Sequence, residues 1–289
     1  MIPAGFSYHK ATTLAQAFEL STEFGEDAKY MSGGHSLLPM MKLRFATPGH
    51  IIDISKIEGL SYIKEEDGLL KIGALTTQTE IEHSQLCKTK YPIFSDATKL
   101  IADPSVRNVG TIGGNIAHGD AANDHPALML AMNAVIIAEG KDGRRSIPIE
   151  EFFHGFYMTA LEPSEILVEI QIPEATSRSG GAYYKVERKV GDYATAGTAI
   201  HLELDDNNVC IKAGIALTNV SAVPLKLERA EQLLTGQTIT DELIDQAGTI
   251  ASEDCEPDSD LRGSEAYKRS IAKTITIKMI QKALERAKS

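Results

Sequence analysis

The chain has 289 residues, 43% of them hydrophobic, and its 29 basic and 40 acidic residues leave a formal net charge of −11. The length favours two domains, and the acidic balance argues against a nucleic acid or an anionic membrane as partner, since phosphate contacts need a basic patch. The three cysteines are far apart and form no CxxC pair, so this chain alone supplies neither a structural zinc site nor a complete iron–sulfur ligand set.

The N-terminus has no basic region followed by an apolar stretch, so we expect no secretory signal peptide. No apolar run approaches the roughly 20 residues that a membrane-spanning helix needs, so we expect no integral membrane segment. Without a disulfide framework, the expected compartment is the cytoplasm.

The first part of the chain alternates short helices and strands. The expected elements are a helix over 12–24, a strand over 28–31, a helix over 37–45 and a buried strand over 50–54. Pro39 fits the third of these if Ser36 caps the helix, because first-turn amides lack intrahelical partners in any case.

The next part carries two hairpin signals. The expected elements are a hairpin over 61–74, a helix over 77–84, a polar glycine-rich stretch over 103–124, a helix over 126–133 and a strand over 134–138. Asp67-Gly68 and Asp142-Gly143 are typical of hairpin turns.

Proline, serine, threonine and glycine cluster over 173–181, and this composition break predicts a domain boundary. The predicted domains are therefore 1–176 and 177–289. The second domain is expected to hold strands over 182–188, 193–204 and 209–218, and helices over 225–234, 241–252 and 264–288. The pair Gly180-Gly181 is interpreted as a linker or turn.

Two glycine-rich loops are the candidate ligand-binding features, Ser32-Gly33-Gly34-His35-Ser36 and Thr111-Ile112-Gly113-Gly114-Asn115. Adjacent glycines allow positive φ and the close approach of a ligand, and successive backbone N–H groups can form a concave anion site. A Gly-Gly pair by itself is more often a tight turn. The sequence has no GxGxxG and no GxxxxGK[ST], which excludes the commoner dinucleotide and P-loop sites.

The surroundings of these loops resemble one family. Ser32 to Arg44 resembles the first FAD loop of the molybdenum hydroxylase flavoproteins, the xanthine dehydrogenase family. Ile101 to Asn115, continuing to Asp124, is similar to the second loop, and Lys185 to Ala196 to the region near the flavin ring. The resemblance covers essentially the whole chain, and within the family it is closest to the medium subunits of aerobic carbon monoxide dehydrogenases.

The resemblance implies an α+β fold. It consists of an FAD-binding domain of the vanillyl-alcohol-oxidase type, with subdomains at about 1–55 and 56–176, and a C-terminal domain with a three-stranded sheet and a helical bundle.

The resemblance also implies the site. The residues carried over as FAD-binding are Ser32, Gly33, Gly34, His35, Ser36, Ile101, Thr111, Ile112, Gly113, Gly114, Asn115, Asp124, Leu161, Lys185 and Tyr193. The two loops are expected at the diphosphate, and Ile101 and Leu161 at apolar contacts near the adenine or the ring. No residue of this chain is predicted to be a substrate-converting catalyst or a metal ligand.

Several of these positions have alternative interpretations. Asp124 is expected to bond the ribose or nearby backbone, but its position before His125-Pro126 also suits a helix N-cap. Lys185 is expected at the polar edge of the ring, or is a solvated strand lysine. Tyr193 is expected beside the isoalloxazine, or is a half-buried strand tyrosine. His35 is expected to act through its backbone N–H rather than its ring.

One position departs from the family pattern. Ala121 follows Asp120 where the family commonly has proline, which loosens that turn. This puts fine positioning in doubt and leaves the FAD assignment in place.

By resemblance, the chain is an electron-transfer subunit. It would take electrons from the [2Fe–2S] clusters of a small partner subunit, while a large subunit with the molybdenum cofactor oxidises the substrate, in a dimer of heterotrimers. The alternatives are a stand-alone FAD-dependent oxidoreductase, for which we find no substrate domain or acid–base cluster, and a non-catalytic nucleotide-binding scaffold.

Overall fold

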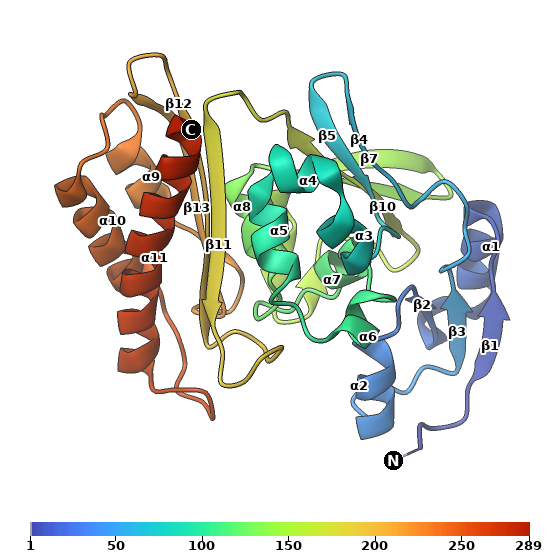
Figure 1. Ribbon diagram of the computed structural model, residues 1–289. Coiled ribbons are helices and arrows are strands. Elements are labelled where there is room, and N and C mark those ends of the chain that lie inside the picture. The colour runs from blue at the N-terminus through green and yellow to red at the C-terminus, as the bar shows by residue number, and fades with distance from the viewer. Residues whose placement is uncertain (1) are drawn as a thin grey trace.

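The computed structural model describes residues 2–289, which hold four sheets. Figure 1 shows the layers in order across the molecule: a C-terminal helical layer, the C-terminal sheet, a central group of helices, a five-stranded sheet and a small N-terminal sheet. Helices and sheets are thus mixed along the chain, and the predicted α+β class is confirmed.

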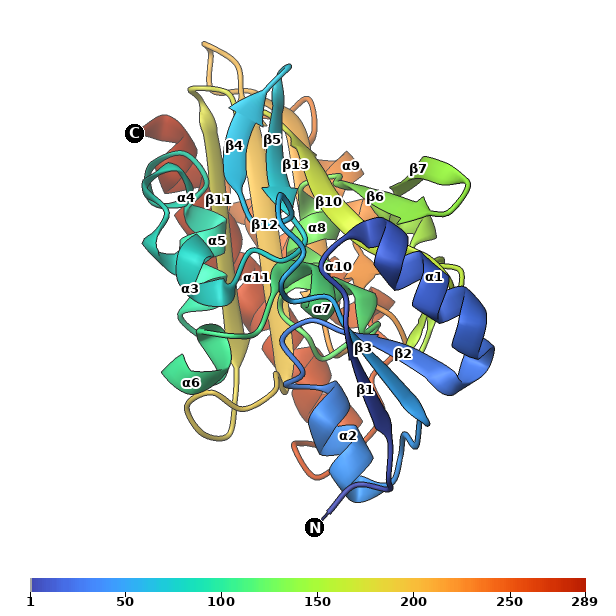
Figure 2. The ribbon, with the colours of Figure 1, turned by 90° about the vertical axis from the view of Figure 1, so that its right-hand side faces the viewer.

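The N-terminal segment folds as a parallel sheet with a crossover helix. Its elements are β1 (Ser7–Lys10), α1 (Leu14–Phe24), η1 (Gly25–Asp27), β2 (Ala28–Met31), α2 (Leu37–Leu43) and β3 (His50–Asp53), with strand order β1-β3-β2. Helix α1 begins after Thr13, whose side chain accepts the N–H of Gln16, and it buries Ala17 and Phe18. Figure 2 shows β1, β3 and β2 side by side near α1.

The second sheet is antiparallel and five-stranded. Its strands, in spatial order, are β4 (Ile63–Glu66), β5 (Leu69–Gly73), β10 (Ile166–Pro173), β6 (Val135–Gly140) and β7 (Gly143–Pro148). Asp67 and Gly68 both have positive φ, 57° and 74°, as the two-residue turn between β4 and β5 requires. Both predicted hairpins are present, but the second turns at Lys141-Asp142 rather than at Asp142-Gly143, because Gly143 already pairs with Gly140 as the first residue of β7.

Short helices connect these strands and form the central layer. They are α3 (Gln78–His83), α4 (Gln85–Thr89), α5 (Pro92–Thr98), α6 (Pro104–Arg107), α7 (Ile112–Ala117), α8 (His125–Ala131) and η2 (Ile149–Glu151), followed by the small strands β8 (Phe153–Gly155) and β9 (Met158–Thr159). Thr77 and Glu80 form a reciprocal capping box at the start of α3. Phe94, Leu128 and Phe152 are fully buried and belong to the core of this layer.

The C-terminal segment has three long strands and one short one. Its elements are β11 (Ser179–Val186), β12 (Ala196–Leu204), β13 (Cys210–Thr218), β14 (Leu225–Lys226), α9 (Glu228–Leu234), α10 (Asp241–Asp254) and α11 (Glu265–Lys288). The three long strands and the helices match the expected domain. The helix expected from Leu225 begins at Glu228, because Leu225 and Lys226 pair with Leu217 and Ala216 as a fourth strand.

The interpretation of Gly180-Gly181 as a linker or turn is wrong. Both residues lie inside β11, paired with Leu202 and His201 of β12. A Cβ on Gly180 would lie 2.1 Å from the carbonyl oxygen of Ala283 in α11, so glycine is needed there for close packing of the helix on the sheet.

The C-terminal sheet separates two cores. Tyr183 and Ala199 pack with the central helices, whereas their neighbours Ala182 and Ile200 pack with α9, α10 and α11. This alternation is the pattern of a sheet covered on both faces. The chain passes from β10 to β11 within the break at 173–181, and the division into 1–176, with subdomains at about 1–55 and 56–176, and 177–289 remains a prediction.

Charged side chains also join the layers. Asp96 of α5 accepts hydrogen bonds from Nζ of Lys282 at 3.0 Å and from Nη1 of Arg286 at 2.7 Å, both on α11.

Within residues 2–289, each helix is too short or too polar to span a bilayer.

Candidate functional site

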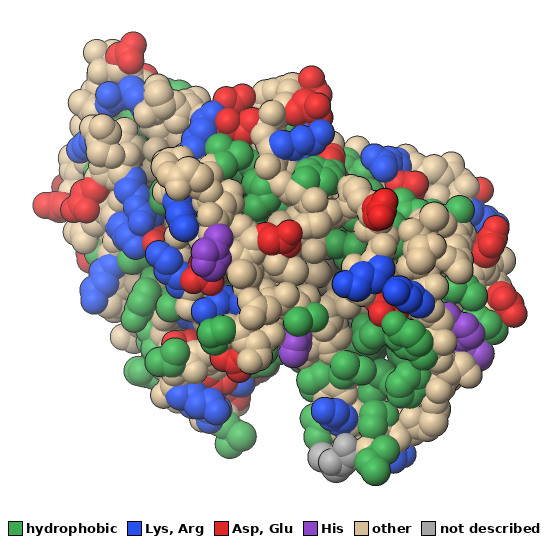
Figure 3. All heavy atoms as spheres, turned by 45° about the vertical axis from the view of Figure 1, so that its right-hand side comes forward, with side chains coloured by type: hydrophobic (Ala, Val, Ile, Leu, Met, Phe, Trp, Pro, Cys, Tyr) green, Lys and Arg blue, Asp and Glu red, His purple; other side chains and the backbone are tan. Residues whose placement is uncertain are grey.

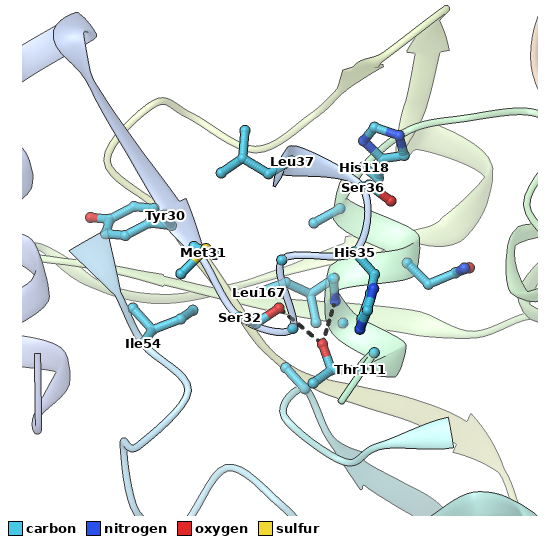
Figure 4. A pocket seen from close by; sticks show the side chains of 18 of the residues that line it. Tyr30, Met31, Ser32, His35, Ser36, Leu37, Ile54, Thr111, His118 and Leu167 are labelled. Carbon is cyan, nitrogen blue, oxygen red and sulfur yellow. Dashed lines mark hydrogen bonds between the residues drawn. The ribbon is translucent and has the colours of Figure 1, made fainter. Parts of the chain in front are cut away.

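A cavity of about 450 Å³ lies between the N-terminal parallel sheet and the five-stranded sheet. This volume is within the range of small-molecule sites, about 300–1,000 Å³. The predicted site residues that line it are Ser32, Gly33, Gly34, His35, Ser36, Ile101, Thr111, Gly113, Gly114, Asn115 and Leu161. Figure 4 shows side chains from both glycine-rich loops facing this space.

The first loop offers unpaired backbone N–H groups. In the described part of the chain, the N–H groups of Gly33, Gly34, His35 and Ser36 have no hydrogen-bond acceptor. Gly34 has φ +71°, which glycine adopts without steric cost. Successive free amides beside a cavity are suited to an anion such as a diphosphate.

Ser36 does not act as the predicted cap of α2. Its backbone is helical, with φ −100° and ψ −49°, and its side chain accepts no hydrogen bond from the helix. The chain already turns at Gly34, whose carbonyl accepts the N–H of Leu38 at 2.9 Å. The Ser36 side chain therefore remains available on the cavity wall.

The second loop uses its amides internally. Thr111 caps α7 by accepting the N–H of Gly114 at 3.1 Å, and its carbonyl accepts the N–H of Asn115 at 3.0 Å. The N–H groups of Ile112 and Gly113 donate to the carbonyls of Thr76 and Ala74. The two loops therefore differ: the first supplies N–H donors, and the second supplies a compact wall.

The loops touch each other through glycine and hydroxyl groups. Ser32 Oγ and Thr111 Oγ1 are 3.0 Å apart. A Cβ on Gly33 would lie 2.4 Å from the carbonyl oxygen of Val109, and one on Gly114 would lie 2.7 Å from Ser32 Oγ. Only glycine permits this approach, so the paired glycines are explained by the contact between the loops as well as by a ligand.

The cavity also presents one unsatisfied side-chain oxygen that suits a polar ligand. Asn115 Oδ1 is buried and has no hydrogen-bond partner in the described chain. An unpaired buried acceptor is destabilising and is commonly satisfied by a ligand or by water. The Asn115 oxygen and the free amides of the first loop together suit a nucleotide, which bears both phosphate and hydroxyl groups.

Four predicted residues do not line the cavity. Ile112 is fully buried behind it. Asp124 is buried and accepts hydrogen bonds from the Tyr183 hydroxyl at 2.6 Å and from Lys185 Nζ at 3.0 Å. Tyr193 lies outside the lining but close to Tyr157, which belongs to it.

The structure changes the interpretation of Asp124 and Lys185. Asp124 precedes α8 but caps it with no side-chain hydrogen bond, so the N-cap alternative is wrong. Lys185 is 2% exposed, which also rules out a solvated strand lysine. Burial raises the pKa of Asp124, and the positive charge of Lys185 opposes that rise. The pair forms because each charge neutralises the other in the interior.

Two cavity residues were not singled out from the sequence. His118 and Tyr157 both line the cavity, with ring centroids 4.7 Å apart. Burial lowers the pKa of His118, with Asp120 acting against it, so the imidazole is neutral near pH 7. The signal for His118 was its place in the block that ends at Asp124, whereas no sequence pattern marked Tyr157.

Comparisons with known proteins agree with this geometry. Residues 4–175 match the family model described as the FAD binding domain in molybdopterin dehydrogenase, and residues 181–283 match the CO dehydrogenase flavoprotein C-terminal domain. Fold and site together therefore define a flavoprotein whose cofactor is FAD.

Similar proteins include the carbon monoxide dehydrogenase medium chain of Hydrogenophaga pseudoflava, 46% identical over 99% of this chain and 98% of the relative. A second is the 6-hydroxypseudooxynicotine dehydrogenase complex subunit alpha of Paenarthrobacter nicotinovorans, 33% identical over 100% of this chain and 97% of the relative. A solved structure of the Hydrogenophaga pseudoflava carbon monoxide dehydrogenase that lacks the Mo-pyranopterin moiety matches with a TM-score of 0.96 and 45% identity, covering 99% of each chain.

The chain belongs to the family of FAD-binding subunits of molybdenum-containing dehydrogenases, which includes the carbon monoxide dehydrogenase medium chains. The resemblance predicted from the sequence is thereby confirmed, and the protein is an oxidoreductase subunit.

Proposed function

We propose that this chain is the electron-relay subunit of a molybdenum hydroxylase. It takes electrons from [2Fe–2S] clusters on a small partner subunit and passes them to an external acceptor, while a large molybdenum subunit oxidises the substrate. The observation that carries the proposal is the cavity beside the two glycine-rich loops, where four N–H groups have no acceptor among residues 2–289.

The loops are proposed to hold the diphosphate of FAD. The N–H groups from Gly33 to Ser36 donate to phosphate oxygens, and Ser32, Thr111 and Asn115 offer side-chain polar groups across the cavity. Ile101 and Leu161 provide apolar contact. When bound, FAD supplies a ring that exchanges one or two electrons, and the protein positions the ring and excludes water.

The division of labour is supported by what this chain contains. Cys87, Cys210 and Cys255 are free, buried and separate, and residues 2–289 hold no cluster of three His, Cys, Asp or Glu suited to a metal. Iron–sulfur clusters need several cysteines, so the proposal places them, and the molybdenum cofactor, on partner chains.

Exposed hydrophobic residues are consistent with partner binding. Ile2 and Phe45 are 83% and 79% exposed, and Arg44 joins these segments by donating to the carbonyl of Ile2 at 3.0 Å. Figure 3 shows hydrophobic side chains gathered on the lobe that carries the N-terminus, beside a notch in the lower edge. Exposed apolar patches commonly mark interaction sites. The proposed assembly is a dimer of heterotrimers in the cytoplasm.

Flavin reduction by substrate separates the proposal from its rivals. The co-purified complex and the chain alone are each mixed, without oxygen, with carbon monoxide, an aldehyde, a purine and an N-heterocycle. We expect one of these to bleach the flavin in the complex and none to bleach it in the lone chain. Bleaching in the lone chain would favour a stand-alone oxidoreductase, and a complex without flavin would favour a scaffold.

A further inference from the structure

The loop between β11 and β12 closes onto the rim of the cavity. Gly191 has φ +79°, and a Cβ there would lie 2.4 Å from the carbonyl oxygen of Ala102. The neighbour of Ala102, Ile101, lines the cavity. The same loop carries Tyr193, so its position relative to the cavity depends on how the loop is held.

Arg262 reaches this loop from the connection between α10 and α11. Its Nη2 is 3.4 Å from Asp192 Oδ1, and its guanidinium lies 5.7 Å from the centroid of the Tyr193 ring. Asp192 Oδ1 also accepts the N–H of Tyr193 at 2.9 Å. The Arg262 side chain therefore contacts both the Tyr193 ring and the Asp192 carboxylate, which accepts the backbone N–H of Tyr193.

The backbone of Arg262 is itself held in place by Asp260. Asp260 Oδ1 accepts the N–H groups of Arg262 and Gly263 at 2.7 and 3.1 Å. The other carboxylate oxygen of Asp260 accepts from Nζ of Lys268 at 2.9 Å, and Lys268 is only 3% exposed. The turn is thus anchored to α11, and the guanidinium projects from a rigid support.

The hydrogen bonds of the Arg262 side chain do not by themselves explain its position. Its Nε is buried without a hydrogen-bond partner in the described chain, which is unfavourable for a charged donor. A solvated arginine would avoid that loss. The side chain is held where it covers Tyr193, and a role at the neighbouring cavity accounts for the position.

We propose that Arg262 is a positioning residue for the flavin site, acting through Asp192 and Tyr193 to hold the β11–β12 loop against the cavity. The inference rests on the proposed FAD function. Arg262 itself contacts no cofactor in this assignment. The C-terminal unit thereby contributes to a site built mainly from residues before 176.

The test compares Arg262→Ala, Arg262→Lys and Arg229→Ala in the full chain purified with its flavin. Arg229 is the matched control, because it also pairs with carboxylates, Glu253 and Asp254, but on α10. We expect Arg262→Ala to raise the Kd for FAD about tenfold and to change the visible circular dichroism of the flavin. Arg262→Lys should recover part of both, since lysine restores the charge and not the planar contact.

Asp192→Asn combined with Arg262→Ala completes the experiment as a double-mutant cycle, in which the two changes should be less than additive. An Arg262→Ala protein with the Kd and flavin dichroism of Arg229→Ala would overturn the inference. A raised Kd for FAD would also overturn the inference if the free energy of unfolding of the apoprotein in urea fell by an equivalent amount. Absence of FAD from the unmodified protein would instead contradict the proposed function.

Discussion

Gly33 is the residue at which the two loops of the cavity meet. Its missing side chain lets the backbone of Val109 approach, and the same glycine presents an unpaired N–H to the cavity. Packing and binding therefore depend on one position.

Gly33→Ala should separate the loops, because the new Cβ would lie 2.4 Å from a backbone oxygen that has little freedom to move. We expect a loss of about 1–3 kcal/mol in unfolding free energy, the usual range for overpacking, and a weaker hold on FAD. Urea unfolding and flavin retention on gel filtration measure these effects. Gly5→Ala is the control, because no atom of residues 2–289 outside its chain neighbours lies within 4 Å of its Cβ position. Equal behaviour of the two variants would contradict the proposed role of Gly33.

The second prediction for single residues concerns the buried ion pair of Asp124 and Lys185. Lys185→Met leaves the Asp124 carboxylate buried with only the Tyr183 hydroxyl as donor, and we expect a cost of about 3–5 kcal/mol. The double variant with Asp124→Asn removes both charges and should recover a large part of that loss. Urea unfolding of the flavin-free proteins provides the comparison. A double variant less stable than Lys185→Met would show that the pair is not what stabilises this interior.

Between elements, α5 and α11 are joined by Asp96 with Lys282 and Arg286. Burial on its own raises the pKa of Asp96, but the hydrogen bonds from Arg286 and Lys282 outweigh burial and lower the pKa overall. The carboxylate is 16% exposed, so water screens this contact less than a surface ion pair.

Asp96→Asn should lower the unfolding free energy by about 1–3 kcal/mol at neutral pH. A carboxylate with a lowered folded-state pKa contributes stability that is present above its unfolded pKa, roughly 3.9, and is lost as pH falls through the folded value. The difference between the native protein and the variant should therefore be constant above about pH 5 and shrink below about pH 4. Urea titrations across this pH range measure the difference. Glu265→Gln is the control, because Glu265 forms an exposed ion pair with Arg269 within α11. A difference that grows toward low pH would contradict the assignment.

Local chemistry also explains which elements were predictable. Asp67-Gly68 predicted its hairpin because the required positive φ is a property of two adjacent residues. Gly180-Gly181 was wrongly predicted as a turn, because Gly180 is needed for its contact with Ala283 of α11, a residue distant in the sequence. Leu225 and Lys226 follow a local helical pattern, and their pairing with β13 depends on a partner strand that the local pattern does not reveal.

At the scale of the whole molecule, segments far apart in sequence form one cavity, among them residues within 29–37, 110–118 and 157–167. The glycine-rich loops were predictable because each is a contiguous motif, and the structure brings them into contact. Asp124 was expected at the ribose or nearby backbone and Lys185 at the polar edge of the flavin ring. In the structure they pair with each other, a contact between residues 61 positions apart. Tyr157 was missed, since only the fold places it beside His118.

This chain is proposed to hold FAD while partner chains hold the metals. The most direct measurement is the visible spectrum of the native, co-purified complex, followed by denaturation, identification of the released flavin and its ratio to this chain. We predict flavin bands over broad iron–sulfur absorption and one released FAD per copy of the chain. A native complex that releases no FAD would contradict it.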